Sequence, residues 1–363
     1  MKSRLTLGIL ILCALFINVA NLAAEGDWTR KADMPTVRSS FSTSVVDGKI
    51  YAIGGEVDKF GDMDLATVEM YDPKTDTWTQ KTDMPTSRRT STCVVDGKIY
   101  AIGGSKIHKR RIFAGHGRDI TELATVEMYD PVTDTWTQKA DMPTARSTHT
   151  CAVDGKIYAI GGAAFNNIKK KKPWRLDLVE VYDPATDTWA KAKSMNHARD
   201  SFAVSVVDGK IYAMGGTGWP QIPFHPGPFL SVVEVFNPKT NQWREIGDMP
   251  AAKSSHTASV INGKIYVIGG FFRGNGLDMK DFKTIEIYHP ETGRWTQKSN
   301  MPVGKSGHAA EVIKGKIYIF TGVGHDDATF ATVEVYNTGE FPQSVDPTGK
   351  LVKTWGSLKK GGN

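Results

Sequence analysis

The sequence predicts an all-β protein of six repeated units, each containing four antiparallel strands, because two patterns recur together through most of its 363 residues. The first pattern is a Gly-Lys-Ile-Tyr phrase that leads to a Gly-Gly doublet. The second is a tyrosine or phenylalanine that precedes a tryptophan by seven residues, and no unit shows a helical period. The phrase begins at Gly48, Gly97, Gly155, Gly209, Gly263 and Gly315. Such internal repetition is a better guide to domain number than length, so we expect one closed domain.

Each unit contains the signals of four strands in order. The first strand, such as 39–46, ends at an Asp-Gly or Asn-Gly turn in five copies, which is a strong hairpin signal. The second strand ends at the glycine doublet, where the backbone adopts an unusual φ or approaches a neighbour closely. After a loop of variable length, residues 67–71 alternate in polarity as a third strand. The Asp72-Pro73 turn leads to a fourth strand at Trp78.

These motifs resemble the Kelch repeat across residues 25–337. The resemblance implies a six-bladed β-propeller with four strands per blade, named a to d from the central channel outward. The sixth unit lacks its tryptophan after Tyr336, whereas the amino terminus carries a spare tryptophan strand at Trp28. We therefore expect the amino-terminal strand to complete the last blade and close the ring. A competing hypothesis uses the tail around Trp355 for the same edge.

The amino terminus has the pattern of a secretory signal peptide. Lys2 and Arg4 precede an apolar run from Leu5 to Ala20, and small residues follow at Ala23 and Ala24. The expected domains are a signal peptide (1–24), the propeller (25–340) and a carboxy-terminal tail (341–363). We thus expect a secreted or periplasmic protein with no membrane span after signal removal; the alternative is a retained anchor. Cys93 and Cys151 lie at equivalent places in successive units and are expected to be buried thiols rather than a disulfide.

Ligand contacts are expected on the face that carries the loops after the Gly-Gly doublets, since binding residues concentrate on loops of a rigid scaffold. The loops of blades two and three carry charges of +3 and +4, which predict an electropositive sector for an acidic protein or carbohydrate. Solvated lysines without a partner are the alternative. The residues expected to bind here are Lys109, Arg110, Arg111, Lys170, Lys171 and Trp174.

Aromatic residues beside prolines characterise the same loops in blades four and five. Trp219 and Phe271 are the binding candidates, because exposed aromatic rings stack on sugar faces or hold a peptide. The alternative is that these aromatic residues fold back and cover the channel.

A basic residue stands near the start of each inner strand. By resemblance to Kelch propellers that bind acidic peptides, these residues imply a cationic ring at the channel mouth. The alternative is structural pairing with aspartates such as Asp33, Asp83, Asp141 and Asp248. The six residues are Arg38, Arg88, Arg146, Arg199, Lys253 and Lys305.

The sequence gives little support for catalysis. His149, His256 and His308 come from different units without nearby carboxylates or thiolates, so we expect satisfied structural histidines and no metal site. We find no cofactor motif and expect no nucleic-acid partner. The first hypothesis is a monomeric, non-enzymatic module that binds an acidic or glycosylated protein or a carbohydrate. The second is an enzyme resembling sialic-acid mutarotases, in which Glu311, where other units have Ser or Cys, supplies the carboxylate. A purely structural surface or matrix protein is the third.

Overall fold

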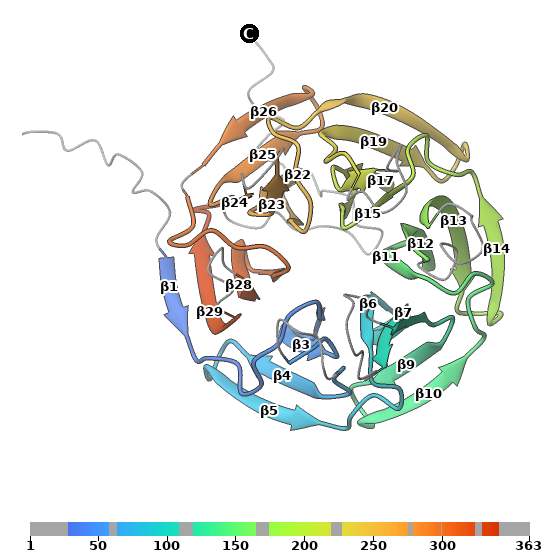
Figure 1. Ribbon diagram of the computed structural model, residues 1–363. Coiled ribbons are helices and arrows are strands. Elements are labelled where there is room, and N and C mark those ends of the chain that lie inside the picture. The colour runs from blue at the N-terminus through green and yellow to red at the C-terminus, as the bar shows by residue number, and fades with distance from the viewer. Residues whose placement is uncertain are drawn as a thin grey trace, which may run out of the picture.

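The computed structural model contains six antiparallel sheets arranged as blades around a central opening (Figure 1); five have four strands, and the second has a fifth, short strand besides its four. It describes residues 28–57, 64–108, 119–164, 174–218, 227–274, 279–298, 300–323 and 329–340. Within these ranges the regular elements are all strands, and none of them forms a helix long and apolar enough to cross a membrane. The predicted fold class, a six-bladed propeller, is confirmed.

The first three blades follow the chain order from the centre outward. Blade one contains β2 (Ser42–Val46), β3 (Lys49–Ile53), β4 (Val68–Asp72) and β5 (Thr77–Lys81). Blade two contains β6 (Arg89–Val95), β7 (Lys98–His108), β9 (Val126–Asp130) and β10 (Thr135–Lys139), and the short β8 (Asp119–Glu122) pairs with the end of β7. Blade three contains β11 (Ser147–Val153), β12 (Lys156–Ala163), β13 (Arg175–Asp183) and β14 (Thr188–Ala192).

Blades four and five add small two-stranded sheets in the loops beside the channel. Blade four contains β16 (Ala203–Val207), β17 (Lys210–Met214), β19 (Val232–Asn237) and β20 (Gln242–Asp248), with the extra pair β15 (Arg199–Asp200) and β18 (Thr217–Gly218). Blade five contains β21 (Thr257–Ile261), β22 (Lys264–Ile268), β25 (Ile285–His289) and β26 (Arg294–Gln297), with the extra pair β23 (Phe271–Arg273) and β24 (Met279–Asp281).

The two ends of the described chain meet in blade six. Its strands are β27 (Ala309–Ile313), β28 (Lys316–Val323), β29 (Thr329–Asn337) and, at the outer edge, β1 (Trp28–Lys31). Trp28 lies opposite Tyr336 in the β1–β29 register, and their ring centroids are 5.1 Å apart. Figure 1 shows β1 beside β29 at the rim. Closure by the amino-terminal strand is thus confirmed, and it replaces an open sheet edge.

Hydrophobic side chains form six separate clusters, each between two neighbouring blades. The isoleucine of every Gly-Lys-Ile-Tyr phrase is fully buried, as at Ile50 and Ile99. Burial of one such side chain contributes about 1.5–3 kcal/mol. The turn glycines and the residues before them have positive φ, as at Asp47 (51°) and Gly48 (70°), which explains the Asp-Gly preference.

Short polar contacts join the inner strands of neighbouring blades. In blades one, two and six, the residue four before the hairpin glycine forms a hydrogen bond with the residue five before the glycine of the next blade. Ser44 Oγ lies 2.9 Å from Thr92 Oγ1, and Cys93 forms a hydrogen bond with Thr150. Blades three, four and five lack this contact, because Val204, Ala258 and Ala310 of the next blades have no hydroxyl group. The Ser205 and Ser259 hydroxyls are consequently buried without a hydrogen-bond partner among the described residues.

Both cysteines of the described residues are free and buried. Burial raises the pKa of the Cys93 thiol to about 12, so this side chain is a protonated, small apolar group at neutral pH.

Candidate functional site

The six basic residues expected at the channel mouth lie inside the blades. Arg38, Arg88, Arg146 and Arg199 are 0% exposed, Lys253 is 0% exposed and Lys305 is 1% exposed. Each forms an ion pair with a glutamate of strand c, and not with the aspartates considered from the sequence. The pairs are Arg38–Glu69, Arg88–Glu127, Arg146–Glu180, Arg199–Glu234, Lys253–Glu286 and Lys305–Glu334. This corrects the expectation of a cationic ring open to a ligand.

The buried ion pairs hold the loop after strand b in place. Arg38 donates to the Gly54 carbonyl oxygen at 3.0 Å and to the Glu69 carboxylate at 2.8 Å. In the other direction, the Gly55 N–H donates to the Arg88 carbonyl of the next blade at 3.1 Å. A Cβ atom on Gly55 would lie 2.7 Å from the Ser39 carbonyl oxygen, so glycine is required there. The basic residue and the glycine doublet of the repeat therefore form hydrogen bonds both within one blade and to the next blade.

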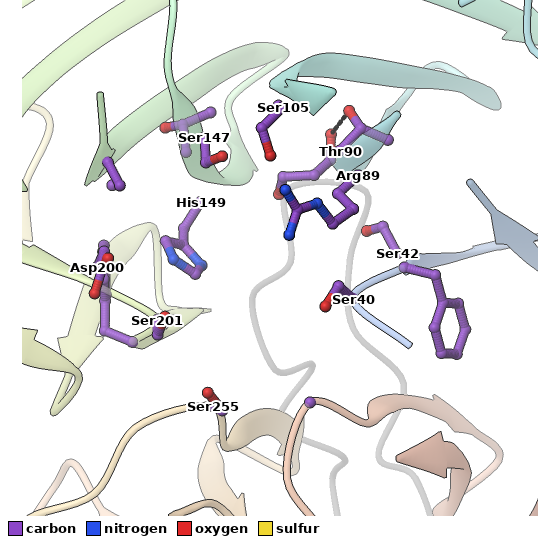
Figure 2. A pocket seen from close by; sticks show the side chains of 18 of the residues that line it. Ser40, Ser42, Arg89, Thr90, Ser105, Ser147, His149, Asp200, Ser201 and Ser255 are labelled. Atoms are coloured by element: carbon purple, nitrogen blue, oxygen red, sulfur yellow. Dashed lines mark hydrogen bonds between the residues drawn. The ribbon is translucent and has the colours of Figure 1, made fainter. Parts of the chain in front are cut away.

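A cavity of about 440 Å³ lies at the channel mouth, on the face that carries the loops after the doublets. Its lining includes Gly104 and Gly162 and is rich in hydroxyl groups from several blades, among them Ser42, Ser147 and Ser255. The volume is in the range of small-ligand sites, which is about 300–1,000 Å³. The loop face was predicted to carry function, and it is here that the molecule is hollowed (Figure 2).

Arg89 is the cation that lines this cavity among the described residues. Figure 2 shows the Arg89 and His149 side chains directed into the cavity from different blades. Arg89 lies 3.8 Å from the Glu56 carboxylate and 3.8 Å from Asp64, which are ionic contacts too long for hydrogen bonds. Its Nε atom is buried without a hydrogen-bond partner among the described residues. With respect to the described part of the chain, the Arg89 guanidinium therefore retains unused hydrogen-bond donors at the mouth.

Sequence reasoning missed Arg89 because it directly follows Arg88, which matches the repeat. Arg88 turns into the blade and Arg89 turns to the channel, as expected for neighbouring residues whose side chains point in opposite directions. A signal was available in the sequence, since the residues that follow the conserved basic residue in the other five blades are all Ser or Asp. A basic residue at this position departs from the repeat.

A second ion pair forms one side of the mouth. Arg175 donates to Asp200 at 3.2 Å and to the Gly218 carbonyl oxygen at 2.7 Å, and its guanidinium lies 3.9 Å from the Trp174 ring centroid. Burial raises the pKa of Asp200 from its usual value, while Arg175 and Thr217 oppose this shift. Trp174 is thus placed near the mouth through Arg175, but it does not line the cavity.

Other predicted contacts are not brought to the cavity or lie outside the described residues. Phe271 packs on Phe229 with ring centroids 5.9 Å apart and does not line the cavity, in agreement with aromatic residues that fold onto one another. The predicted binding residues outside the described ranges are Lys109, Arg110, Arg111, Lys170, Lys171 and Trp219.

Three histidines lie along the channel, and burial lowers the pKa of each. The pKa of His149 falls to about 4 and that of His308 to about 3, with Lys305 also lowering the latter. The pKa of His256 is lowered by burial and by Lys253, partly offset by the Met214 backbone. Neither ring nitrogen of His256 makes a hydrogen bond of normal geometry within the described part of the chain. The expectation that all three are satisfied therefore does not hold for His256.

Farther along the channel, a second cavity of about 210 Å³ shares His149, Phe202 and His308 with the first. Glu311 lines this deeper cavity and does not line the mouth. Burial raises the pKa of Glu311 to about 7, and a hydrogen bond with the Thr43 side chain opposes the shift. Within the described ranges, no group of three or more His, Cys, Asp or Glu side chains is arranged to hold a metal ion.

Comparison with known families identifies the repeat. A family model described as the KLHDC2/KLHL20/DRC7 Kelch-repeats domain matches residues 108–270 and 203–349, which together span more than half of the chain. The Kelch motif model matches residues 38–85. The resemblance inferred from the repeats agrees with both matches.

Similar proteins extend the comparison. Kelch-like protein 36 of Bos taurus is 26% identical over 290 residues, covering 79% of this chain and 44% of the relative. Kelch-like protein terF of Aspergillus terreus is 30% identical over 231 residues, covering 61% of this chain and 49% of the relative. The chain thus spans less than half the length of these relatives. A solved structure of YjhT has a TM-score of 0.69 at 17% identity and covers 84% of this chain and 95% of that one, which shows a shared fold.

Proposed function

Since the chain belongs to the Kelch-repeat family, we propose that it is a protein-binding module whose partner places an acidic side chain in the channel mouth. The observation that carries this proposal is Arg89. Its guanidinium lines a cavity of about 440 Å³, and its ionic contacts with described residues are long ones, to Glu56 and Asp64. A carboxylate can accept two parallel hydrogen bonds from such a planar group.

The hydroxyl-rich lining supports the same proposal. Ser40, Ser201 and Ser255 line the mouth with φ of 53°, 51° and 54°, a region that non-glycine residues seldom adopt. Hydroxyl groups donate and accept, so they suit the remaining polar atoms of a peptide or a glycan. The basic loops of blades two and three, although outside the described residues, follow strands on the same face and would attract an acidic partner.

The mutarotase hypothesis has less support. It requires a carboxylate and an arginine beside one sugar acid. Glu311 lines the deeper cavity and Arg89 lines the mouth, and the carboxylate that lines the mouth, Asp200, is paired with Arg175. A bound anion next to Glu311 would also meet its negative charge. A binding role therefore accounts better for the arrangement of charges than catalysis does.

We further propose export of the protein with removal of residues 1–24. The support is the sequence alone, in which a basic start, an apolar run and small residues occur in the order of a signal peptide.

The binding proposal is tested with a fluorescent peptide of six glutamates and a matched peptide of six glutamines. We expect the glutamate peptide to bind with an affinity that falls as salt is added. Arg89→Gln should lower this affinity about tenfold, in keeping with loss of a charge-assisted hydrogen bond. Fluorescence anisotropy measures both effects.

The matched control is Arg294→Gln, which makes the same chemical change at an exposed arginine after the β25–β26 turn. It should leave the affinity unchanged. Equal affinity for the two peptides, or equal loss in both variants, contradicts the proposal.

A further inference from the structure

Glu311 departs from the repeat at a position that faces neighbouring blades. The equivalent residues, four before each hairpin glycine, are Ser44, Cys93, Cys151, Ser205 and Ser259. Blade six alone has an ionisable carboxyl group there. Its contact across the closure seam is a hydrogen bond with Thr43 of blade one. A serine in this place would make the same kind of contact, as Ser44 does with Thr92, so the seam does not require a carboxylate.

The deeper cavity contains no compensating cation among the described residues that line it. His149, His256 and His308 line it, but burial lowers their pKa values and keeps the imidazoles neutral at neutral pH. Lys253 and Lys305 lie nearby but are paired with Glu286 and Glu334 inside the blades. Once ionised, the Glu311 carboxylate is thus the formal charge that faces this cavity.

We propose that the deeper cavity binds a small organic ammonium group beside the Glu311 carboxylate. The cavity of about 210 Å³ has room for about seven water molecules, enough for an ammonium with a short carbon chain. This cavity adjoins the mouth and shares lining residues such as His149 with it, but Glu311 lines the deeper cavity and Arg89 does not, so the ammonium proposal does not rest on the partner proposed for Arg89.

The remaining lining suits this ligand. Thr43, Thr150 and Thr257 place hydroxyl oxygens along the cavity, and an ammonium has three N–H donors for such acceptors. Phe41 and Phe202 also line it, and aromatic rings attract cations. The Glu311 carboxyl has a pKa raised by burial, and no cation of the described ranges is among the groups that act on it. A bound ammonium would supply the missing positive charge and favour the ionised carboxylate.

The experiment titrates the Glu311 carboxyl carbon by NMR on the full chain, with methylammonium chloride or with sodium chloride at equal ionic strength. Methylammonium should lower the Glu311 pKa, and sodium should leave it in place. Methylammonium should also raise the thermal unfolding midpoint above that in sodium chloride. Glu311→Gln, which keeps the size of the side chain, should abolish this extra increase.

Two further variants make the result decisive. Glu311→Ser introduces the residue that blade one has at this position and should also remove the extra rise in the unfolding midpoint. Glu291→Gln, at an exposed turn, should retain that rise. An unchanged Glu311 pKa with methylammonium overturns the proposal. So does a thermal response that persists in both Glu311 variants, or one that sodium or neutral methanol reproduces.

Discussion

His308 and His256 occupy the positions that Phe41 and Phe202 occupy in blades one and four, seven residues before the hairpin glycine. All four side chains are buried. The His308 ring packs closely on Gly269, in the glycine doublet of the preceding blade. A Cβ atom added to Gly269 would lie only 2.9 Å from His308 Cε1. The imidazole rings of blades five and six thus fill the same buried space as the phenyl rings of blades one and four. Unlike a phenyl ring, an imidazole can bind a proton, and burial disfavours the charged form.

This arrangement predicts acid sensitivity. The pKa of His308 is about 3 when folded and 6.5 in its ordinary state, so its contribution to stability is complete above pH 6.5 and is lost as the pH falls toward the folded value. Each unit of pH in that window costs at most about 1.4 kcal/mol. His308→Phe should therefore lose less stability than the wild type between neutral pH and about pH 4. Urea unfolding at both values measures the difference.

The phenylalanine variant should also show a cost at neutral pH. His308 Nε2 lies 3.0 Å from Thr257 Oγ1, and loss of this hydrogen bond removes about 1 kcal/mol. Glu311 acts in the opposite sense as the pH rises toward 7, but its contribution is common to both proteins and cancels. His197→Phe, at an exposed histidine, is the control. Equal acid sensitivity of wild type and His308→Phe contradicts this account.

At the scale of elements, the sequence predicted strand order and turns better than side-chain partners. Asp-Gly turns and the Tyr–Trp spacing depend on residues close in sequence, so their positions were predictable. The glutamates of strand c, such as Glu69, were placed on a polar face by alternation. Both faces of each sheet are covered by neighbouring blades, and these glutamates are buried against Arg38 and its equivalents. Only the packing of blades determines that pairing.

The contacts between inner strands supply a prediction of increased stability. Ser259 Oγ is buried without a hydrogen-bond partner among the described residues, because Ala310 of the next blade replaces the threonine found at Thr92. Ala310→Thr should supply this partner and raise the free energy of unfolding by about 1 kcal/mol. Ala310→Val has the same shape without the hydroxyl and is the control. Urea unfolding should give a higher free energy of unfolding for Ala310→Thr than for Ala310→Val. The reverse order would show that a hydrogen bond to Ser259 does not stabilise the protein.

At the scale of the whole molecule, the Kelch propeller fold is established, while export and the expected monomeric state stay predictions. Removal of residues 1–24 deletes Lys2 and Arg4 and no acidic residue, which lowers the formal charge from +6 to +4. The binding residues were less predictable than the fold. The fold depends on what six copies share, whereas the site depends on where single copies differ, as at Arg89 and Glu311.

Export predicts a processed protein. After expression in a bacterial host, the intact mass should lack the first 24 residues, and the protein should be found outside the cytoplasm. Leu10→Arg interrupts the apolar run and should leave the chain unprocessed and inside the cell. A wild-type mass that includes the signal segment contradicts the prediction.

The pairing of β1 with β29 has a consequence for the order of biosynthesis. β1 is among the first structured parts to be made, and its partner in blade six is the last strand of the propeller. Blades one to five each contain a complete sheet and can form as the chain emerges. The ring, however, closes only after Asn337 has been synthesised, and until then β1 has no partner strand. The nascent chain must therefore keep its amino-terminal strand available, and closure is the final step that converts five formed blades into one molecule.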